Sequence, residues 1–164
     1  MRNGNSYLHL AAETGQIEAF KTAFSREDDK DIKNRCGKTS FHLACKNGHL
    51  NIVEYLLENT NLNVDINAKD SNSWTGFILA SENGYSNVAR LLMEKSVILG
   101  IDLNAIGVPK NATAFMWACN RGHSNIVKLM IEYKLDNLGI DFNTNNGNGF
   151  LAFIIACSNG LHIK

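Results

Sequence analysis

One stretch of the chain decides its fold: GKTSFHLACKNGHLNIVEYLL, residues 37–57. A short apolar segment, Ser40 to Lys46, runs to Gly48 and is followed by Leu50 to Glu58, in which apolar residues recur at helical spacing. Glycine adopts without strain the left-handed backbone that ends a helix. The stretch therefore predicts two antiparallel helices joined by a glycine-containing turn.

The phrase that ends the first helix occurs five times along the chain. Its copies end at Gly15, Gly48, Gly84, Gly122 and Gly160, which lie 33, 36, 38 and 38 residues apart. Such a period is typical of repeat proteins. In repeats two to four an Asp-apolar-Asn tripeptide follows the second helix, at 65–67, 102–104 and 141–143. A polar turn then leads to the next threonine and the next helix pair.

The repeats predict one all-α domain over residues 1–164, an α-solenoid of stacked helix-turn-helix units joined by β-hairpin-like loops. An alanine recurs in each first helix, and so small a side chain lets neighbouring helices pack closely. One helix pair buries too little apolar surface to fold alone, so its neighbours must supply the rest of its core. The last unit stops where its second helix should begin, which favours a piece of a longer array over an end covered by a partner. The alanines are Ala11, Ala44, Ala80, Ala118 and Ala156, and the repeats span approximately 1–33, 34–69, 70–107, 108–145 and 146–164, the last incomplete.

Composition excludes several classes of protein. The 164 residues include 16 Lys+Arg, 16 Asp+Glu, one proline and 45% hydrophobic residues, which excludes disorder and collagen. A net charge of zero gives no overall basic excess for nucleic acid, although a local patch stays open. The longest apolar stretch, 150–157, is too short to cross a bilayer, and the first residues contain no signal peptide. We expect a cytoplasmic protein, with the nucleus as the alternative, that binds neither nucleic acid nor membrane and keeps its cysteines reduced.

The repeating unit closely resembles that of the ankyrin repeat family, which reads roughly Asp-x-x-Gly-x-Thr-Pro-Leu-His-x-Ala-Ala-x-x-Gly-His-x-x-Ile-Val-x-x-Leu-Leu. Residues 37–57 carry the strongest match, and Gly122 to Val127 repeats part of it. The family's histidine hydrogen-bonds with the preceding threonine, but it survives here only as His9 and His42. The later repeats should therefore rely more on apolar packing. Ile78, Met116 and Ile154 replace that histidine, and Tyr7, Ser40, Gly76, Ala114 and Ala152 replace the family's proline.

The resemblance implies a protein-interaction module that binds a partner in a concave groove, between the hairpin tips and the exposed ends of the first helices. Bases dominate the corresponding positions, where eight bases face only the acids Glu13 and Glu82. Because positive charge steers an acidic partner and an aromatic residue such as Trp74 often anchors one, we expect an acidic peptide or protein surface. Lysines scattered on a solvated face are the alternative. The predicted partner-binding residues are Arg2, Asn5, Lys33, Arg35, Lys38, Lys46, Asn47, Lys69, Asn72, Trp74, Glu82, Asn83, Lys110, Asn120, Arg121 and Phe150.

No motif indicates chemistry of another kind. The chain has neither a Gly-x-Ser-x-Gly elbow nor a glycine-rich phosphate loop, so we expect no catalytic residue, no cofactor and no enzyme. His42, Cys45 and His49 could share a helical face, but Gly48 ends the helix first and closed zinc sites need four ligands, so we expect no metal. A rigid spacer within a larger scaffold or effector, and an enzyme inhibitor that acts through the groove, are alternative functions. We expect a monomer or part of a longer repeat chain.

Two further features have alternative interpretations. In some family members the asparagine equivalent to Asn67, Asn104 and Asn143 is hydroxylated, but a structural role in the turn is the favoured interpretation. The charged run Arg26 to Asp31 is interpreted as solvated loop charge, with an acidic docking patch as the alternative.

Overall fold

The computed structural model of the chain describes residues 4–59, 64–108, 110–135 and 139–142. Helices form antiparallel pairs in this part of the chain, and each pair lies within one of the first four predicted repeats. No β-strand occurs among the described residues. The pairs are α1 (Tyr7–Thr14) with α2 (Ile17–Arg26), α3 (Ser40–Asn47) with α4 (Leu50–Glu58), α5 (Gly76–Glu82) with α6 (Ser86–Leu99), and α7 (Ala114–Arg121) with α8 (Ser124–Leu135).

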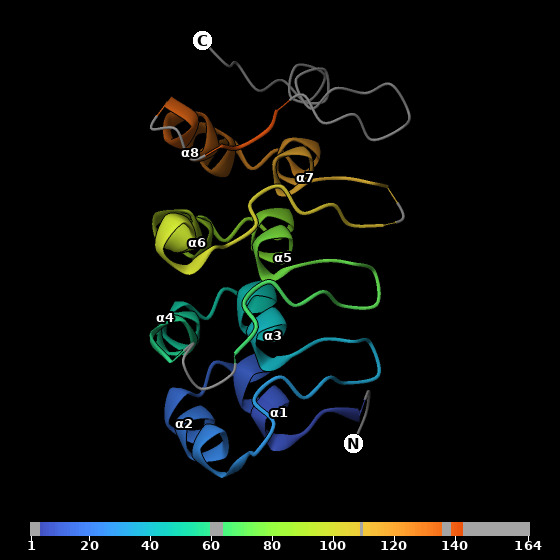
Figure 1. Cartoon of the computed structure of the whole chain (residues 1–164), viewed down its shortest axis with the longest axis vertical. Helices are drawn as coiled ribbons and strands as arrows, with labels where there is room; N and C mark the ends of the chain where they lie inside the picture. The colour runs from blue at the N-terminus through green and yellow to red at the C-terminus, as the bar shows by residue number, and fades with distance from the viewer. Residues whose placement is uncertain (1–3, 60–63, 109, 136–138, 143–164) are drawn as a thin grey trace.

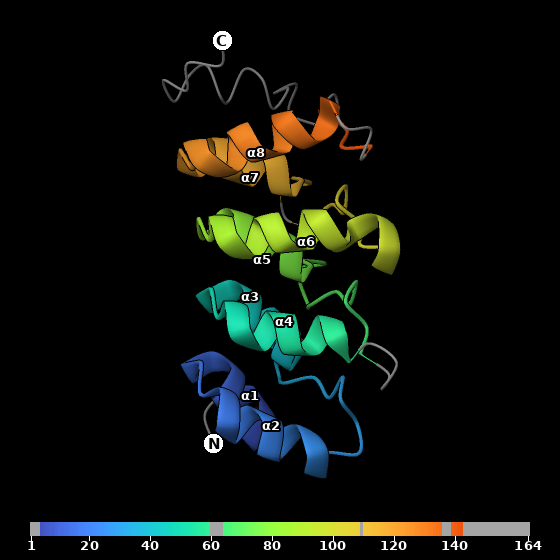
Figure 2. The same ribbon diagram turned by 90° about the vertical axis from the view of Figure 1, so that its left-hand side faces the viewer.

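The helix pairs stack in a single row (Figure 1). The first helices α1, α3, α5 and α7 contact each other in sequence and form one layer, while α2, α4, α6 and α8 form the second. Figure 2 shows the second layer face-on, with its helices following one another along the row. The loops between repeats project from the opposite side of the first layer. The predicted all-α repeat fold is confirmed.

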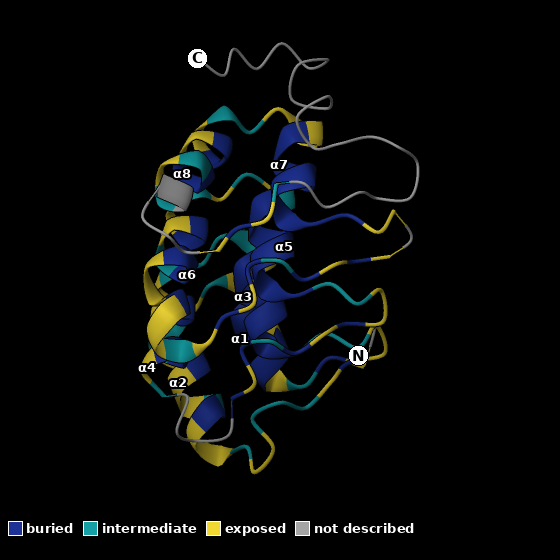
Figure 3. Cartoon of the chain, turned by 45° about the horizontal axis from the view of Figure 1, so that its top comes forward, coloured by how far each residue is buried: buried dark blue, intermediate teal, exposed yellow. Residues whose placement is uncertain are grey.

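The core runs along the row between the two layers. The first-layer helices are buried over most of their length, whereas exposed residues gather on the second layer and the loops (Figure 3). Ala44, Ala80 and Ala118 are 0% exposed. A larger side chain at these positions would have to displace a neighbouring helix, because protein interiors are close-packed.

Glycine ends α3 for two physical reasons. Gly48 has φ +72°, a left-handed conformation that costs L-amino acids free energy, and its N–H bonds back to the carbonyls of Ala44 and Cys45. A Cβ atom at Gly48 would also overlap the ring of Tyr85 in the next repeat. The glycine thus ends the helix and lets the next repeat approach.

Thr39 and His42 cap the start of α3, and His42 also joins this helix to the next repeat. His42 Nε2 donates to the Trp74 carbonyl at 3.0 Å, and Nδ1 accepts from the Thr39 hydroxyl at 2.9 Å and from the Thr39 N–H at 3.1 Å. Where the histidine is missing, the buried side chains of Ile78 and Met116 fill its place. The expectation that later repeats replace this hydrogen bonding with apolar packing is confirmed for repeats three and four.

Acid should destabilise the fold through His42. Burial lowers the pKa of His42 below its ordinary value of 6.5, so below that pH the unfolded chain takes up a proton more readily than the folded one. The free energy of unfolding should therefore fall as pH drops from 6.5 through the lowered pKa. Urea denaturation between pH 7 and pH 5 measures this slope. His42→Ile, which copies Ile78, should flatten it; an unchanged slope in that variant would contradict the assignment.

Candidate binding surface

We define the hairpin surface as the exposed residues of the loops 33–38, 69–74 and 106–112 together with the exposed ends of the first helices. It lies on the side of the row away from the second layer (Figure 1). The partner-binding residues predicted from the sequence belong to this surface, and the structure divides those that it describes into two groups. Some are held by contacts within the chain, and others present charge to solvent.

The first loop is organised by buried asparagines. Asn5 is 7% exposed, accepts a hydrogen bond from Asn34 Nδ2 at 2.8 Å and donates to Glu13 at 3.0 Å. The side-chain oxygen of Asn34 accepts hydrogen bonds from the backbone N–H groups of Cys36 and Lys38. Asn5 therefore has a structural role, and its burial leaves little of it for a partner to contact.

Asp70 takes the place of Asn34 in the second loop. Its Oδ1 accepts from the N–H groups of Asn72 at 2.8 Å and Trp74 at 3.0 Å, and its Oδ2 forms an ion pair with Lys38. Burial by itself raises the pKa of Asp70, but the hydrogen bonds from Lys38 and the two N–H groups outweigh it, so the pKa is lowered. The Asp70 side chain is 1% exposed and that of Lys38 16%, so the charge of Lys38 is already paired.

Trp74 is held within the chain. Its Nε1 donates to the Val108 carbonyl at 2.8 Å, and its ring packs on Trp117 with centroids 5.0 Å apart. A Cβ at Gly107 would lie 2.5 Å from the Trp74 ring, so glycine is needed there for the loop to approach. The ring is half-buried rather than freely presented as an anchor.

Trp117 is the centre of a cluster that the sequence analysis missed. It is 6% exposed, with Lys110 Nζ 5.0 Å and Arg121 Cζ 5.7 Å from its ring centroid. Arg121 also donates from Nε to Glu82 at 3.0 Å and forms an ion pair with it. The only signal in the sequence was a tryptophan at a position that is leucine in the three preceding repeats.

Two of the candidate asparagines bond to their own helices. Asn47 Nδ2 donates to the Leu43 carbonyl, and Asn83 Nδ2 donates to the equivalent Leu79 carbonyl, both at 2.9 Å. These bonds satisfy carbonyls near the ends of α3 and α5. Asn120 and Asn72 are exposed. Arg2 and Phe150 lie outside the described residues, as do Cys157 and Asn143.

Exposed bases make up the rest of the surface. Lys33, Arg35, Lys46, Lys69 and Lys110 are all exposed and, within the described part of the chain, none of them forms an ion pair. Lys33 Nζ donates to the Lys69 carbonyl at 3.1 Å, which brings the bases of two successive loops together. These five residues give the hairpin surface its positive charge.

The candidate metal ligands do not form a site. Both ring nitrogens of His42 are engaged, His49 Nε2 donates to the Glu13 carbonyl at 3.0 Å, and burial raises the pKa of the Cys45 thiol. No group of three or more possible ligands is brought together among the described residues. Within the same residues, no helix is long and apolar enough to span a membrane.

The tripeptide asparagines link one repeat to the next. Asn67 accepts from the Asp102 N–H and donates to the Gly100 carbonyl, both at 2.8 Å. Asn104 makes the same pair of bonds with Asp141 and Gly139. Both atoms of each amide are used, which supports the structural role expected for these residues.

Part of the charged run is this same tripeptide in repeat one. Asp31 Oδ2 accepts from the Asp65 N–H at 2.7 Å, as Asn67 and Asn104 do in the following repeats. Its other oxygen, Oδ1, is buried and has no hydrogen-bond partner among the described residues. Burial raises the pKa of Asp31, with a further rise from Asp65 and Asp29. The interpretation of residues 26–31 as solvated loop charge therefore does not hold for Asp31, which links repeat one to repeat two.

Asp31→Asn should stabilise the protein. The amide has an N–H to donate where the carboxylate has none, and it removes the repulsion from two neighbouring acids, so we expect a gain of about 1 kcal/mol at neutral pH. Because the pKa of Asp31 is raised, its protonation stabilises the folded wild type as pH falls. The difference in free energy of unfolding between Asp31→Asn and the wild type should therefore become smaller toward pH 4. Paired thermal melts at pH 7 and pH 4 measure this; a less stable Asn variant would contradict it.

The comparisons with known proteins agree with this architecture. The family model of ankyrin repeats (3 copies) matches residues 8–106 and 98–164. Alpha-latroinsectotoxin-Lt1a of Latrodectus tredecimguttatus is 39% identical over 62 residues, 38% of this chain and 4% of the toxin. A probable E3 ubiquitin-protein ligase of Oryza sativa subsp. japonica, XBOS33, is 36% identical over 53 residues, 32% of this chain and 10% of the ligase. The chain thus spans only a small part of these relatives. Since the family model covers nearly the whole chain, the protein belongs to the ankyrin repeat family.

Proposed function

We propose that this chain is a non-catalytic interaction module that binds an acidic peptide or an acidic protein surface on its hairpin surface. Ankyrin repeats generally serve as protein–protein interaction modules and are typically non-catalytic. The observation that carries the finer proposal is the row of exposed bases, Lys33, Arg35, Lys46, Lys69 and Lys110, on one side of a chain whose net charge is zero. A concentration of one sign of charge raises the association rate of a partner of opposite sign.

Ion pairs within the chain reduce the number of bases that are available to a partner. Lys38 is neutralised by Asp70 and Arg121 by Glu82, so neither contributes a free charge. The five remaining bases lie on successive loops and helix ends, which suits an extended or convex partner with several carboxylates. The half-buried ring of Trp74, which packs on the buried Trp117 beneath Lys110, adds a limited apolar contact area next to that charge.

A peptide-display selection tests the proposal. Random peptides are panned on residues 1–164, and the selected sequences are synthesised with a fluorescein label for anisotropy titrations. We expect enrichment of Asp and Glu, and affinities that fall as salt rises. Reversing three exposed bases, Lys46→Glu, Lys69→Glu and Lys110→Glu together, should weaken binding by about tenfold or more.

The matched control reverses three exposed bases on the second layer: Arg90→Glu, Lys95→Glu and Lys128→Glu. This variant has the same net charge as the first and should keep its affinity. Selected peptides without acidic enrichment, or equal losses in the two triple variants, would contradict the proposal.

A further inference from the structure

The three loops of the hairpin surface close with the same backbone hydrogen bond, and this bond gives their register. Its donors are buried residues, and the residues immediately before and after each donor are exposed. These flanking positions are therefore equivalent in the three loops, and their side chains are open to a partner. The donors are the N–H groups of Asn34, Asp70 and Gly107, which bond to the carbonyls of Lys38, Trp74 and Ala112 at 3.0 to 3.1 Å.

The chemistry of the flanking positions changes along the row of loops. They are occupied by Lys33 and Arg35 in the first loop, by Lys69 and Ser71 in the second, and by Ile106 and Val108 in the third. Ile106 is 43% exposed and Val108 41%. Since polar side chains serve the same places in the other two loops, the hairpin itself does not require aliphatic ones there. We call Ile106 and Val108 the aliphatic patch.

The aliphatic patch is continuous with the basic part of the surface. The loops are joined by backbone hydrogen bonds, from the Ser71 N–H to the Cys36 carbonyl at 3.1 Å and from the Val108 N–H to the Asn72 carbonyl at 2.8 Å. They follow one another on the same side of the first layer (Figure 1). The half-buried ring of Trp74 extends the patch toward the second loop, because its Nε1 donates to the Val108 carbonyl.

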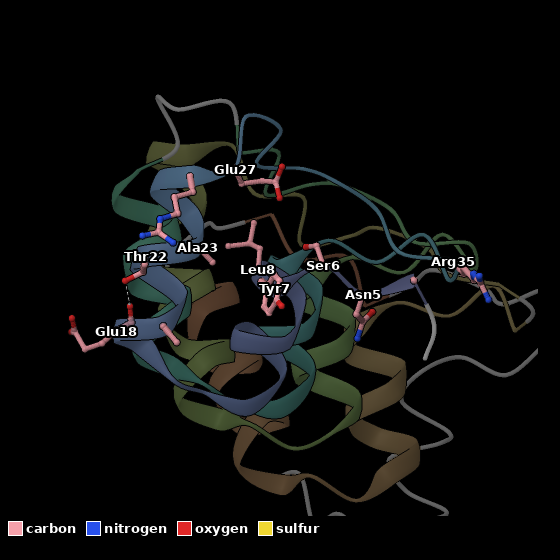
Figure 4. Close-up of a pocket in the computed structure, with 12 residues that line it drawn as sticks. Asn5, Ser6, Tyr7, Leu8, Glu18, Thr22, Ala23, Glu27 and Arg35 are labelled. Carbon is pink, nitrogen blue, oxygen red and sulfur yellow. Dashed lines mark hydrogen bonds between the residues drawn. The ribbon is translucent and has the colours of Figure 1, made fainter. Parts of the chain in front are cut away.

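No acid is exposed on these three loops. Their one acid, Asp70, is buried in its ion pair with Lys38. The close-up of the cavity at repeat one shows Arg35 on the first loop, well away from Glu18 and Thr22 of α2 (Figure 4). A partner on this side therefore meets positive charge on the first two loops and aliphatic side chains on the third.

We propose that the hairpin surface binds an acidic peptide segment that also carries an aliphatic or aromatic side chain. Its carboxylates lie on the first two loops and its apolar side chain lies on the aliphatic patch. This inference rests on the proposed function and specifies the partner further. The carboxylates provide attraction and orientation, and burial of the apolar side chain against Ile106 and Val108 adds affinity.

The spacing of the repeats sets the spacing within the peptide. Packed helices lie about 10 Å apart, so successive loops are separated by about that distance. An extended residue spans about 3.3 Å. The apolar side chain should therefore lie about three residues from the carboxylate that meets the second loop.

Peptide panning on two forms of residues 1–164 tests the inference. One form is the wild type, and the other is the patch variant, Ile106→Lys with Val108→Ser, which gives the third loop the flanking residues of the second. We expect the wild type to select acidic residues together with an apolar residue at a fixed spacing, and the patch variant to select acidic residues alone. In anisotropy titrations, serine in place of the apolar residue of a selected peptide should weaken binding to the wild type by about tenfold or more, but binding to the patch variant by less than about twofold.

The matched control makes the same two kinds of substitution elsewhere: Val97→Ser with Ile98→Lys. These side chains are 76% and 78% exposed on α6, in the second layer, and this variant should select peptides as the wild type does. Acidic peptides without an apolar preference would overturn this inference and leave the proposed function standing, whereas peptides without acidic enrichment would overturn both. An equal apolar preference in the wild type and the patch variant would overturn the inference alone, because another surface would then hold the apolar residue. Self-association of the wild type that the patch variant abolishes, measured by sedimentation equilibrium, would overturn it too, because the patch would then join two copies of the chain.

Discussion

Asp70→Ala is expected to lower the free energy of unfolding by about 3 to 5 kcal/mol. The substitution leaves the ammonium group of Lys38 without its partner in a largely buried place, and it removes the acceptor of the Asn72 and Trp74 N–H groups. Because the Trp74 carbonyl also accepts from His42, distortion of this loop should reach the start of α3. Urea denaturation followed by circular dichroism measures the loss.

Asp70→Asn is the matched control, since Asn34 already fills the equivalent place in the first loop. The asparagine also leaves Lys38 without its charged partner, but it keeps an oxygen for both N–H groups, so its cost should be smaller than that of alanine by the contribution of those two hydrogen bonds. The lowered pKa of Asp70 adds a pH dependence: its stabilising contribution is complete above about pH 4 and is lost as pH falls through the lowered pKa. A wild-type stability in Asp70→Ala would contradict this description of the loop.

Ala80→Leu is the second substitution with a large expected effect, a loss of about 3 kcal/mol. Ala80 is 0% exposed, and α5 contacts both α3 and α7, so three added carbons must displace one of the neighbouring helices. Ala19→Leu, at an exposed position of α2, introduces the same side chain without a helix to displace and should change stability by less than about 0.5 kcal/mol. Equal effects at the two positions would show that the alanine row does not govern the stacking.

The helix pairs could be predicted from the sequence because their signals are local. Thr39 and Gly48 cap the two ends of α3, and the apolar spacing of Leu50 to Glu58 predicts the bounds of α4 as observed. The role of Asp31 was hidden because aspartate replaces the tripeptide's asparagine inside a run of charges. Its register with Asn67 becomes visible only through the hydrogen bond to the next repeat.

The binding surface was harder to predict, because residues far away in the sequence decide whether a charged side chain is paired or free. Lys38 and Trp74 were candidates by position, yet Asp70 pairs with the first and Val108 accepts from the second. Trp117 lies buried beneath Lys110, although leucine occupies its position in the three preceding repeats. A repeat pattern places side chains on a face but does not say which of them neutralise each other.

Site-resolved hydrogen exchange of the wild type and of Ala80→Leu tests most directly whether the repeats owe their order to one another. If neighbouring pairs stabilise each other along the row, amides in α3 and α7 will lose protection together with those in α5. A loss confined to α5, with α3 and α7 protected as in the wild type, would show that the helix pairs fold independently and would contradict the account.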